Sequence, residues 1–236
     1  MEQYKNKIFF FADLDDSLFQ TIRKDKSGKF KATYPKNVLK TSFYTKAQYH
    51  LLNFILANHE IVFIPLTART KEQFQRTKIF KNNQASMYSI YYGSTLYIDN
   101  REYAPYTKKV NADSAISFAH LSELINKVKK RYPTVEFINV DQKYYTSDIQ
   151  NKEVKKFIVD LINKKYHDVE AYEEEKYITI LPKVYNKSSV VKYLTSKCKP
   201  KMTIGIGNSV SDIDFLNHCD FKIISHIGML DNKLNS

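Results

Sequence analysis

Short apolar runs rich in β-branched and aromatic residues recur along the chain and predict β-strands. Several carry apolar residues at consecutive positions, which is typical of strands buried on both faces of a sheet. The predicted strands are Lys7–Leu14, Glu60–Ala68, Met87–Gly93, Tyr177–Pro182, Met202–Asn208 and Phe221–His226. Helical periodicity separates many of them, as in Thr45–Asn58 and Ser188–Lys197. Strands that alternate with helices predict an α/β fold with a doubly wound parallel sheet.

One stretch interrupts this alternation, between residues of about 104 and 176. It contains two Lys-rich helix patterns, Leu121–Arg131 and Lys152–Lys165, and strand-like pieces at Thr134–Val140 and around Val169–Tyr172. We therefore expect a small α+β insertion at 104–179, in a core domain formed by 1–103 and 180–236. A shorter irregular segment, Thr21–Pro35, is predicted to form a short hairpin.

The formal net charge of +12 favours anionic partners such as phosphorylated metabolites, nucleic acid or acidic lipid surfaces. Only five of the 37 basic residues are Arg, the residue on which base-edge and bidentate phosphate recognition depends, and the lysines are spread along the chain. This pattern favours a solvated basic surface over a nucleic-acid-binding stripe, so we expect no nucleic-acid partner.

The lengths of the apolar runs and the spacing of the cysteines indicate where the protein is located. No run is long enough to span a bilayer, and the N-terminal run Ile8–Ala12 ends at Asp13, unlike the apolar region of a secretory signal. The two cysteines, Cys198 and Cys219, have no metal-ligand or redox-motif spacing and are expected to be free thiols. We therefore expect a cytoplasmic protein without a membrane partner; the oligomeric state is left open.

Three carboxylates, Asp13, Asp15 and Asp16, follow the first predicted strand directly in "FFFADLDDSLFQT". In open α/β sheets the ligand site lies beyond the carboxyl ends of the strands. If the extended geometry continues, Asp13 and Asp15 share one face while Asp16 points away and serves a turn. Two carboxylates on one face repel unless one takes a proton or a cation lies between them. Hard oxygen ligands favour Mg²⁺.

Four short motifs together resemble those of the haloacid dehalogenase (HAD) superfamily of phosphatases. The first is "DLDDSL" from Asp13, and the second is Thr67 at the end of the next core strand, followed by Arg69. The third is Lys187 at the start of a helix, for which Lys183 is a weaker candidate. The fourth is "GNSVSD", which contains Asn208 and Asp212. "YYGSTLYIDN" (Tyr91–Asn100) resembles the segment before the cap in Cof-type and sucrose-phosphatase-like members, whose cap lies between the second and third motifs.

The resemblance implies a Rossmann-like core and an Mg²⁺-dependent phosphatase for a small phosphorylated metabolite, in particular a sugar phosphate. Asp13 would attack phosphorus to give an aspartyl-phosphate, and Asp15 would act as general acid and base. Thr67 and Lys187 would bind the transferring phosphoryl oxygens, and Leu14, Ala68 and Arg69 would help to bind substrate. The implied metal ligands are Asp13, Asp15, Asn208 and Asp212.

Asn208 departs from the family pattern, which has Asp as a direct metal ligand at this position. An amide can offer its oxygen to Mg²⁺ but adds no charge, so metal affinity should fall. Asp212 would be a water-mediated ligand or a partner for Lys187, and Asp214 is a fallback candidate for the metal ligand. Two alternatives to a phosphatase therefore stay open: a phosphotransferase or mutase that passes the phosphoryl group to a sugar hydroxyl, and a catalytically weakened HAD-like binding or regulatory protein.

Overall fold

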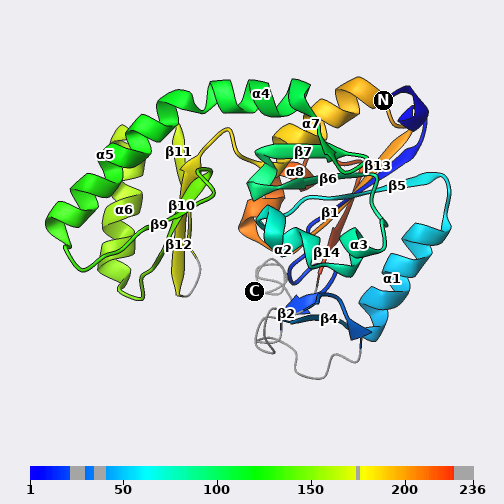
Figure 1. Ribbon diagram of the computed structural model, residues 1–236, viewed down its shortest axis with the longest axis horizontal. Coiled ribbons are helices and arrows are strands. Elements are labelled where there is room, and N and C mark those ends of the chain that lie inside the picture. Colours follow the sequence, from blue (N-terminus) through cyan, green and yellow to red (C-terminus); the bar gives the residue numbers. More distant parts are fainter. Residues whose placement is uncertain (22–29, 35–40, 174–175, 226–236) are drawn as a thin grey trace. The chain divides into compact units, whose positions relative to one another are not determined.

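The computed structural model of the chain (Figure 1) describes residues 1–21, 30–34, 41–173 and 176–225. The chain divides into two compact units. The core unit comprises Met1–Tyr106 and Asn186–Ser236, and the inserted unit comprises Thr107–Tyr185. The predicted insertion, 104–179, differs from these bounds by a few residues.

The core unit contains a four-stranded parallel sheet in the order β14-β13-β1-β5. Its strands are β1 (Ile8–Ala12), β5 (Ile61–Pro65), β13 (Met202–Gly207) and β14 (Phe221–Ile224). Phe9, Phe11 and Ala12 of β1 are fully buried, as the uninterrupted apolar run predicted. Fully burying such a large apolar side chain contributes roughly 1.5–3 kcal/mol. The predicted α/β fold with a parallel sheet is confirmed, and the strand predicted at Phe221–His226 is confirmed as far as the described residues reach.

The order of the strands creates a switch point at β1. From β1 the chain passes through α1 (Lys46–Ala57) to β5 on one side, and it later passes through α7 (Lys187–Cys198) to β13 on the other. Thr45 caps α1 reciprocally with Gln48, as expected for a helix beginning at Ser or Thr with Gln three residues later. Ligand sites in open parallel sheets lie beyond the carboxyl ends of the strands at such a point.

Two small antiparallel sheets and several short helices complete the core unit. One sheet has the order β2-β4-β3, formed by Gln20–Thr21, Ser42–Tyr44 and Phe30–Lys31. The predicted hairpin at Thr21–Pro35 lies largely outside the described residues; β2 and β3, at its two ends, each pair with β4. The other sheet is β6 (Met87–Ile90), β7 (Thr95–Ile98) and β8 (Arg101–Glu102). The short helices are η1 (Glu2–Tyr4), α2 (Lys71–Gln75), α3 (Lys78–Lys81), η3 (Tyr91–Gly93), η4 (Val210–Asp212) and α8 (Ile213–Leu216).

The inserted unit is an α+β structure with its own apolar core. Helix α4 (Ala104–Asp113) leads into it, and α5 (Ala115–Arg131) and α6 (Lys152–Lys165) pack with an antiparallel sheet in the order β11-β12-β10-β9. These strands are Val169–Glu173, Tyr177–Pro182, Tyr144–Asp148 and Ile138–Val140. The predicted strand Tyr177–Pro182 thus belongs to this sheet rather than to the parallel one. Its pairing partners β10 and β11 lie close in sequence, so their contacts cost less loop-closure entropy.

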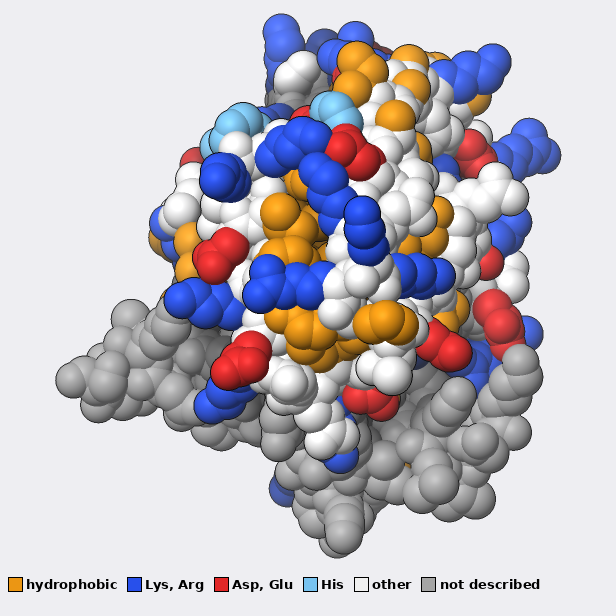
Figure 2. Space-filling view, turned by 90° about the vertical axis from the view of Figure 1, so that its left-hand side faces the viewer, with side chains coloured by type: hydrophobic (Ala, Val, Ile, Leu, Met, Phe, Trp, Pro, Cys, Tyr) orange, Lys and Arg blue, Asp and Glu red, His pale blue; other side chains and the backbone are white. Residues whose placement is uncertain are grey.

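Basic side chains are mixed with acidic and apolar ones on the face of the molecule in Figure 2. In the inserted unit, Lys127 and Lys165 both pair with Glu123, at 3.0 and 2.6 Å. None of the helices among the described residues has the length and apolar character that a membrane crossing requires.

Candidate active site

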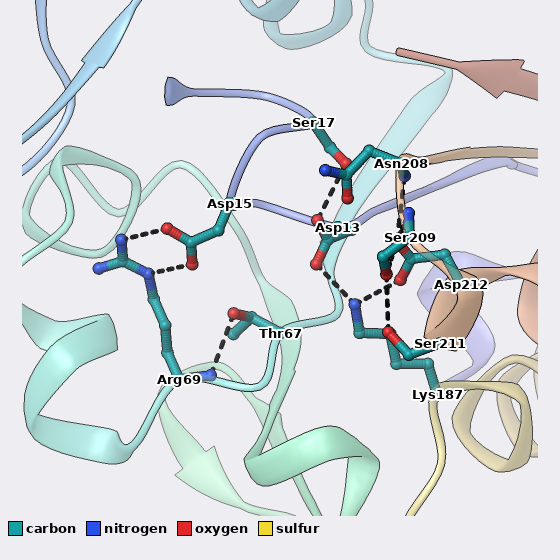
Figure 3. A network of polar contacts seen from close by, with 10 residues as sticks. All are labelled: Asp13, Asp15, Ser17, Thr67, Arg69, Lys187, Asn208, Ser209, Ser211 and Asp212. Atoms are coloured by element: carbon teal, nitrogen blue, oxygen red, sulfur yellow. Dashed lines mark hydrogen bonds and ion pairs between the residues drawn. The ribbon is translucent and has the colours of Figure 1, made fainter. Parts of the chain in front are cut away.

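The ends of three adjacent parallel strands bring the predicted site residues together. Asp13 follows β1, Thr67 follows β5 and Asn208 follows β13. The pairing extends to the tips of these strands, since the Asp13 N–H donates to the Ile206 carbonyl at 2.9 Å. Figure 3 shows the resulting cluster of polar side chains.

Asp13 is the centre of this cluster and is only 7% exposed. Its Oδ2 accepts a hydrogen bond from the Ser17 hydroxyl at 2.9 Å, and its Oδ1 accepts one from Lys187 Nζ at 2.5 Å. Burial raises the pKa of Asp13 to about 7, while Lys187 opposes this increase and Asp212 adds to it. A cation beside Asp13 would favour its ionised form.

A tight turn after β1 fixes the Asp13 side chain. The Leu14 carbonyl accepts hydrogen bonds from the N–H groups of Ser17, Leu18 and Phe19, at 3.3, 3.0 and 3.1 Å. Asp16 has a positive φ of 62°, a conformation that Asp tolerates better than most residues. The sequence assigned Asp16 to a turn. The structure adds that this turn returns the Ser17 hydroxyl to Asp13.

Lys187 joins two buried carboxylates. It is the first residue of α7, is 4% exposed, and donates to Asp13 Oδ1 at 2.5 Å and to Asp212 Oδ1 at 2.6 Å. Burial disfavours the charged ammonium, but the two carboxylates outweigh burial and raise the pKa of Lys187. The ammonium therefore stays charged between the two carboxylates. Lys183, the weaker candidate, lies in the inserted unit and is exposed.

Asp212 organises the loop after β13. Its Oδ2 accepts hydrogen bonds from the N–H groups of Asn208 and Ser209, both at 3.0 Å, and from the Ser209 hydroxyl at 2.8 Å. Burial acts to raise the pKa of Asp212, but Lys187 and these donors hold it below its ordinary value. Gly207 permits the close approach, because a Cβ there would lie 2.6 Å from the Asp212 Cβ. Ser209 is a site residue that the sequence prediction missed; the Ser-to-Asp spacing of a capping box was its signal.

Asp15 has a different partner from Asp13. Both of its carboxylate oxygens accept hydrogen bonds from Arg69, from Nε at 2.8 Å and from Nη2 at 2.7 Å. Arg69 Nη2 also donates to the Ser42 hydroxyl at 3.1 Å, and the guanidinium lies over the Phe19 ring at 4.9 Å. Figure 3 shows Asp15 pointing toward Arg69, on the side away from Lys187. The expected face shared by Asp13 and Asp15 is therefore not seen, because the bidentate guanidinium pair is a strong alternative for Asp15.

The loop after β5 carries Thr67 and is tied to a left-handed turn. The Thr67 hydroxyl accepts a hydrogen bond from the Arg69 N–H at 3.2 Å, and the Thr67 carbonyl accepts one from the Tyr92 N–H at 3.1 Å. Tyr91, Tyr92 and Gly93 have φ values of 50°, 58° and 97°. Gly93 packs against the backbone of Asn186, the residue before Lys187, so this turn links the Thr67 loop to the start of α7.

Leu14 and Ala68, predicted as the last residues of two strands, lie just after β1 and β5, with Leu14 fully buried and Ala68 partly exposed. Their use of backbone N–H groups to bind substrate stays a prediction. Asp214, the second metal-ligand candidate, instead accepts a hydrogen bond from the Ser188 hydroxyl.

The donor set at this site fits a hard divalent cation with two protein side chains. Asp13 and Asn208 are both buried, follow neighbouring strands and offer oxygen donors, which suits an ion such as Mg²⁺ that keeps several waters. Within the described part of the chain, His, Cys, Asp and Glu form no group of three that could hold a metal. The side chains of Asp13, Asp15 and Asp212 all accept hydrogen bonds from neighbouring side chains, so the role of these residues and of Asn208 as metal ligands stays a prediction.

Comparison of the structure with solved structures places the chain in a known fold. The sucrose-phosphatase from Synechocystis sp., solved with sucrose and phosphate, matches with a TM-score of 0.65 and 10% identity, over 98% of this chain and 86% of that one. The C-terminal domain of C. albicans trehalose-6-phosphate phosphatase gives 0.59 and 14%, over 92% and 75%. A haloacid dehalogenase-like hydrolase from B. subtilis gives 0.59 and 12%, over 96% and 92%.

Matches were found in structure alone: no protein-family model matches the chain, and no curated protein does. Identities of this size show a common fold. The chain thus has the fold of the HAD-like hydrolases, as the four sequence motifs predicted.

Proposed function

We propose that the protein is a phosphatase that hydrolyses small phosphate monoesters, with Asp13 as the nucleophile. The observation that carries the proposal is the placement of Asp13, a buried carboxylate at the strand switch point with Lys187 on one oxygen and Ser17 on the other. A carboxylate held by two hydrogen bonds has a defined direction of attack.

In the first proposed step, an Asp13 oxygen forms a bond to phosphorus while the bond from phosphorus to the ester oxygen breaks. Asp15, once it has left Arg69 and taken up a proton from solvent, gives that proton to the leaving ester oxygen, so that an alcohol is released. In the second step water attacks the aspartyl-phosphate, Asp15 takes a proton from the water, and the Asp13 carboxylate is restored as phosphate leaves. Because Asp15 is paired with Arg69, its side chain must leave the guanidinium before it can reach the ester oxygen.

Lys187 and Thr67 would stabilise the transferring phosphoryl group. Lys187 brings a buried positive charge beside Asp13, and Thr67 brings a buried hydroxyl from the neighbouring strand. Phosphoryl transfer depends mainly on such positioning and electrostatic stabilisation. We also propose that Arg69 and the backbone N–H groups of Leu14 and Ala68 help to bind the substrate.

We propose Mg²⁺ as cofactor, held by Asp13 and Asn208, with Asp15 and Asp212 as further candidates. When bound, the ion would neutralise negative charge on the phosphate. With Asp13 ionised, as its role as nucleophile requires, Asp13, Asp212 and Lys187 together carry one net negative charge, and Asp15 is neutralised by Arg69. A phosphate dianion therefore needs additional positive charge at this site.

A sugar phosphate is the proposed substrate. Two proteins of similar fold are a sucrose-phosphatase and a trehalose-6-phosphate phosphatase. We further propose that the inserted unit acts as a cap that selects the substrate.

The test is phosphate release from a panel of phosphorylated sugars, nucleotides and acids, with and without Mg²⁺, by the wild type and by Asp13→Asn. We expect Mg²⁺-dependent release by the wild type alone. Equal behaviour of the two proteins on every compound would contradict the proposal. Product analysis with added sugar acceptors separates hydrolysis from phosphotransfer. Phosphate binding without turnover would favour the other alternative, a catalytically weakened binding or regulatory protein, which the presence of Asn208 in place of Asp supports.

A further inference from the structure

The first turn of α7 contacts the segment from η4 to α8 at three neighbouring points. Lys187 pairs with Asp212, the Lys187 Nζ lies 5.8 Å from the centre of the Phe215 ring, and the Ser188 hydroxyl donates to Asp214 Oδ2. The sequence marked Asp214 only as a possible metal ligand. Its contact with Ser188 places it instead beside the residue that follows Lys187.

Ser188 connects Asp214 to the N-terminal cap of α7. Its side chain is buried, and its hydroxyl lies 2.8 Å from Asn186 Oδ1, which also accepts the Ser189 N–H at 2.8 Å. A hydroxyl has one proton, so it is shared between the Asp214 carboxylate and the cap. Lys187 is thus flanked on both sides by residues of one hydrogen-bonded group, formed by Asn186, Ser188 and Asp214.

The charge of Asp214 offsets an electrostatic cost at the start of α7. A lysine at the N-terminus of a helix faces the positive end of the helix dipole, and Lys187 is also buried. A carboxylate at the same helix end offsets this cost. Asp214 supplies such a carboxylate and accepts its hydrogen bond from Ser188, so the Lys187 ammonium remains available to Asp13 and Asp212. The other Asp214 oxygen lies 3.7 Å from His218 Nε2.

We propose that Asp214, acting through Ser188, is a positioning residue that holds the Lys187 ammonium between Asp13 and Asp212. Its effect on catalysis rests on the proposed phosphatase function, but its effect on Lys187 does not. Asp214 is largely exposed, so its replacement leaves the apolar core intact.

The test uses Asp214→Ala and Ser188→Ala, with Asp160→Ala as a control that removes an exposed carboxylate from the inserted unit. Acylation of Lys187 by acetic anhydride, followed on its peptide by mass spectrometry, reports the position of the ammonium without any substrate. We expect both variants to be labelled about tenfold faster than the wild type, an effect typical of losing a charge-assisted hydrogen bond. The control should not change. Unchanged labelling in both variants would overturn the proposal.

Binding of inorganic phosphate, measured by calorimetry in the presence of Mg²⁺, separates this role from a general loss of structure. Asp214→Ala should weaken phosphate binding in the wild type and have no further effect in Lys187→Met. An equal effect in both backgrounds would overturn a role through Lys187. Faster labelling in the variants of a protein that binds no phosphate would support the positioning role and contradict the phosphatase proposal.

Discussion

Lys187 Nζ donates to Asp13 Oδ1 at 2.5 Å, although the two residues are 174 positions apart in the chain. Asp212 Oδ1 accepts from the same ammonium at 2.6 Å. One buried ammonium thus lies between two buried carboxylates and favours the ionised form of each, while the two carboxylates together raise the pKa of Lys187.

Lys187→Met is expected to destabilise the fold. It leaves Asp13 and Asp212 buried without their cation, and breaking a buried pair in this way costs about 3–5 kcal/mol. Urea unfolding near neutral pH with EDTA measures the loss. Lys192→Met removes an exposed lysine from the same helix and should change the free energy of unfolding little. Equal losses in the two variants would show that the buried ion pairs of Lys187 do not contribute to the free energy of unfolding.

The stability of the metal-free protein should depend on pH through Asp13. Its pKa in the folded protein is raised from 3.8 to about 7, chiefly by burial. The native state then binds the proton more tightly than the unfolded state, so the contribution is fully present below pH 3.8 and is lost as pH rises to about 7. The unfolding free energies of the wild type and of Asp13→Asn are measured against pH across this window with EDTA. Below pH 3.8 the two curves should have the same slope, and between pH 3.8 and about 7 the wild-type free energy should fall relative to that of the variant. Parallel curves throughout would contradict the raised pKa.

Asn208→Asp is expected to tighten binding of Mg²⁺. It adds a second carboxylate beside Asp13, and one charge at such close range should increase affinity by at least about tenfold. Calorimetric titration with Mg²⁺ checks this directly. Asn126→Asp adds the same charge on an exposed position of α5 and is the matched control. If the two variants bind Mg²⁺ with equal affinity, Asn208 is not a ligand.

Gly93→Ala is expected to disturb both stability and phosphate binding. Gly93 has a φ of 97°, and an added Cβ would lie 2.3 Å from the Asn186 carbonyl oxygen, which cannot move without moving Lys187. The combined strain and overlap should cost at least about 2 kcal/mol. Thermal unfolding and phosphate affinity are the measurements, with the exposed Ser122→Ala as control. A stable variant with full phosphate affinity would show that the close approach of Gly93 to Asn186 is not required.

Local patterns in the sequence determined most of the core elements and the positions from which the site is built. Short, mainly apolar runs predicted β1, β5 and β13, because strands buried on both faces of a sheet are apolar at most successive positions. Asp13, Thr67 and Asn208 follow those runs directly, and parallel strands end at one edge of a sheet. Their convergence was therefore predictable before any coordinates.

Tertiary structure decided which partner each charged side chain takes and which sheet some strands join. Asp15 pairs with Arg69 rather than sharing a face with Asp13, and Asp212 pairs with Lys187, one of the two roles that the sequence left open for it. β12 joins the inserted sheet, although its sequence resembles that of a core strand. In each case groups that are far apart in the sequence compete for burial, hydrogen bonds and opposite charge. The outcome depends on which groups lie close together in space, and neither periodicity nor spacing along the chain shows this.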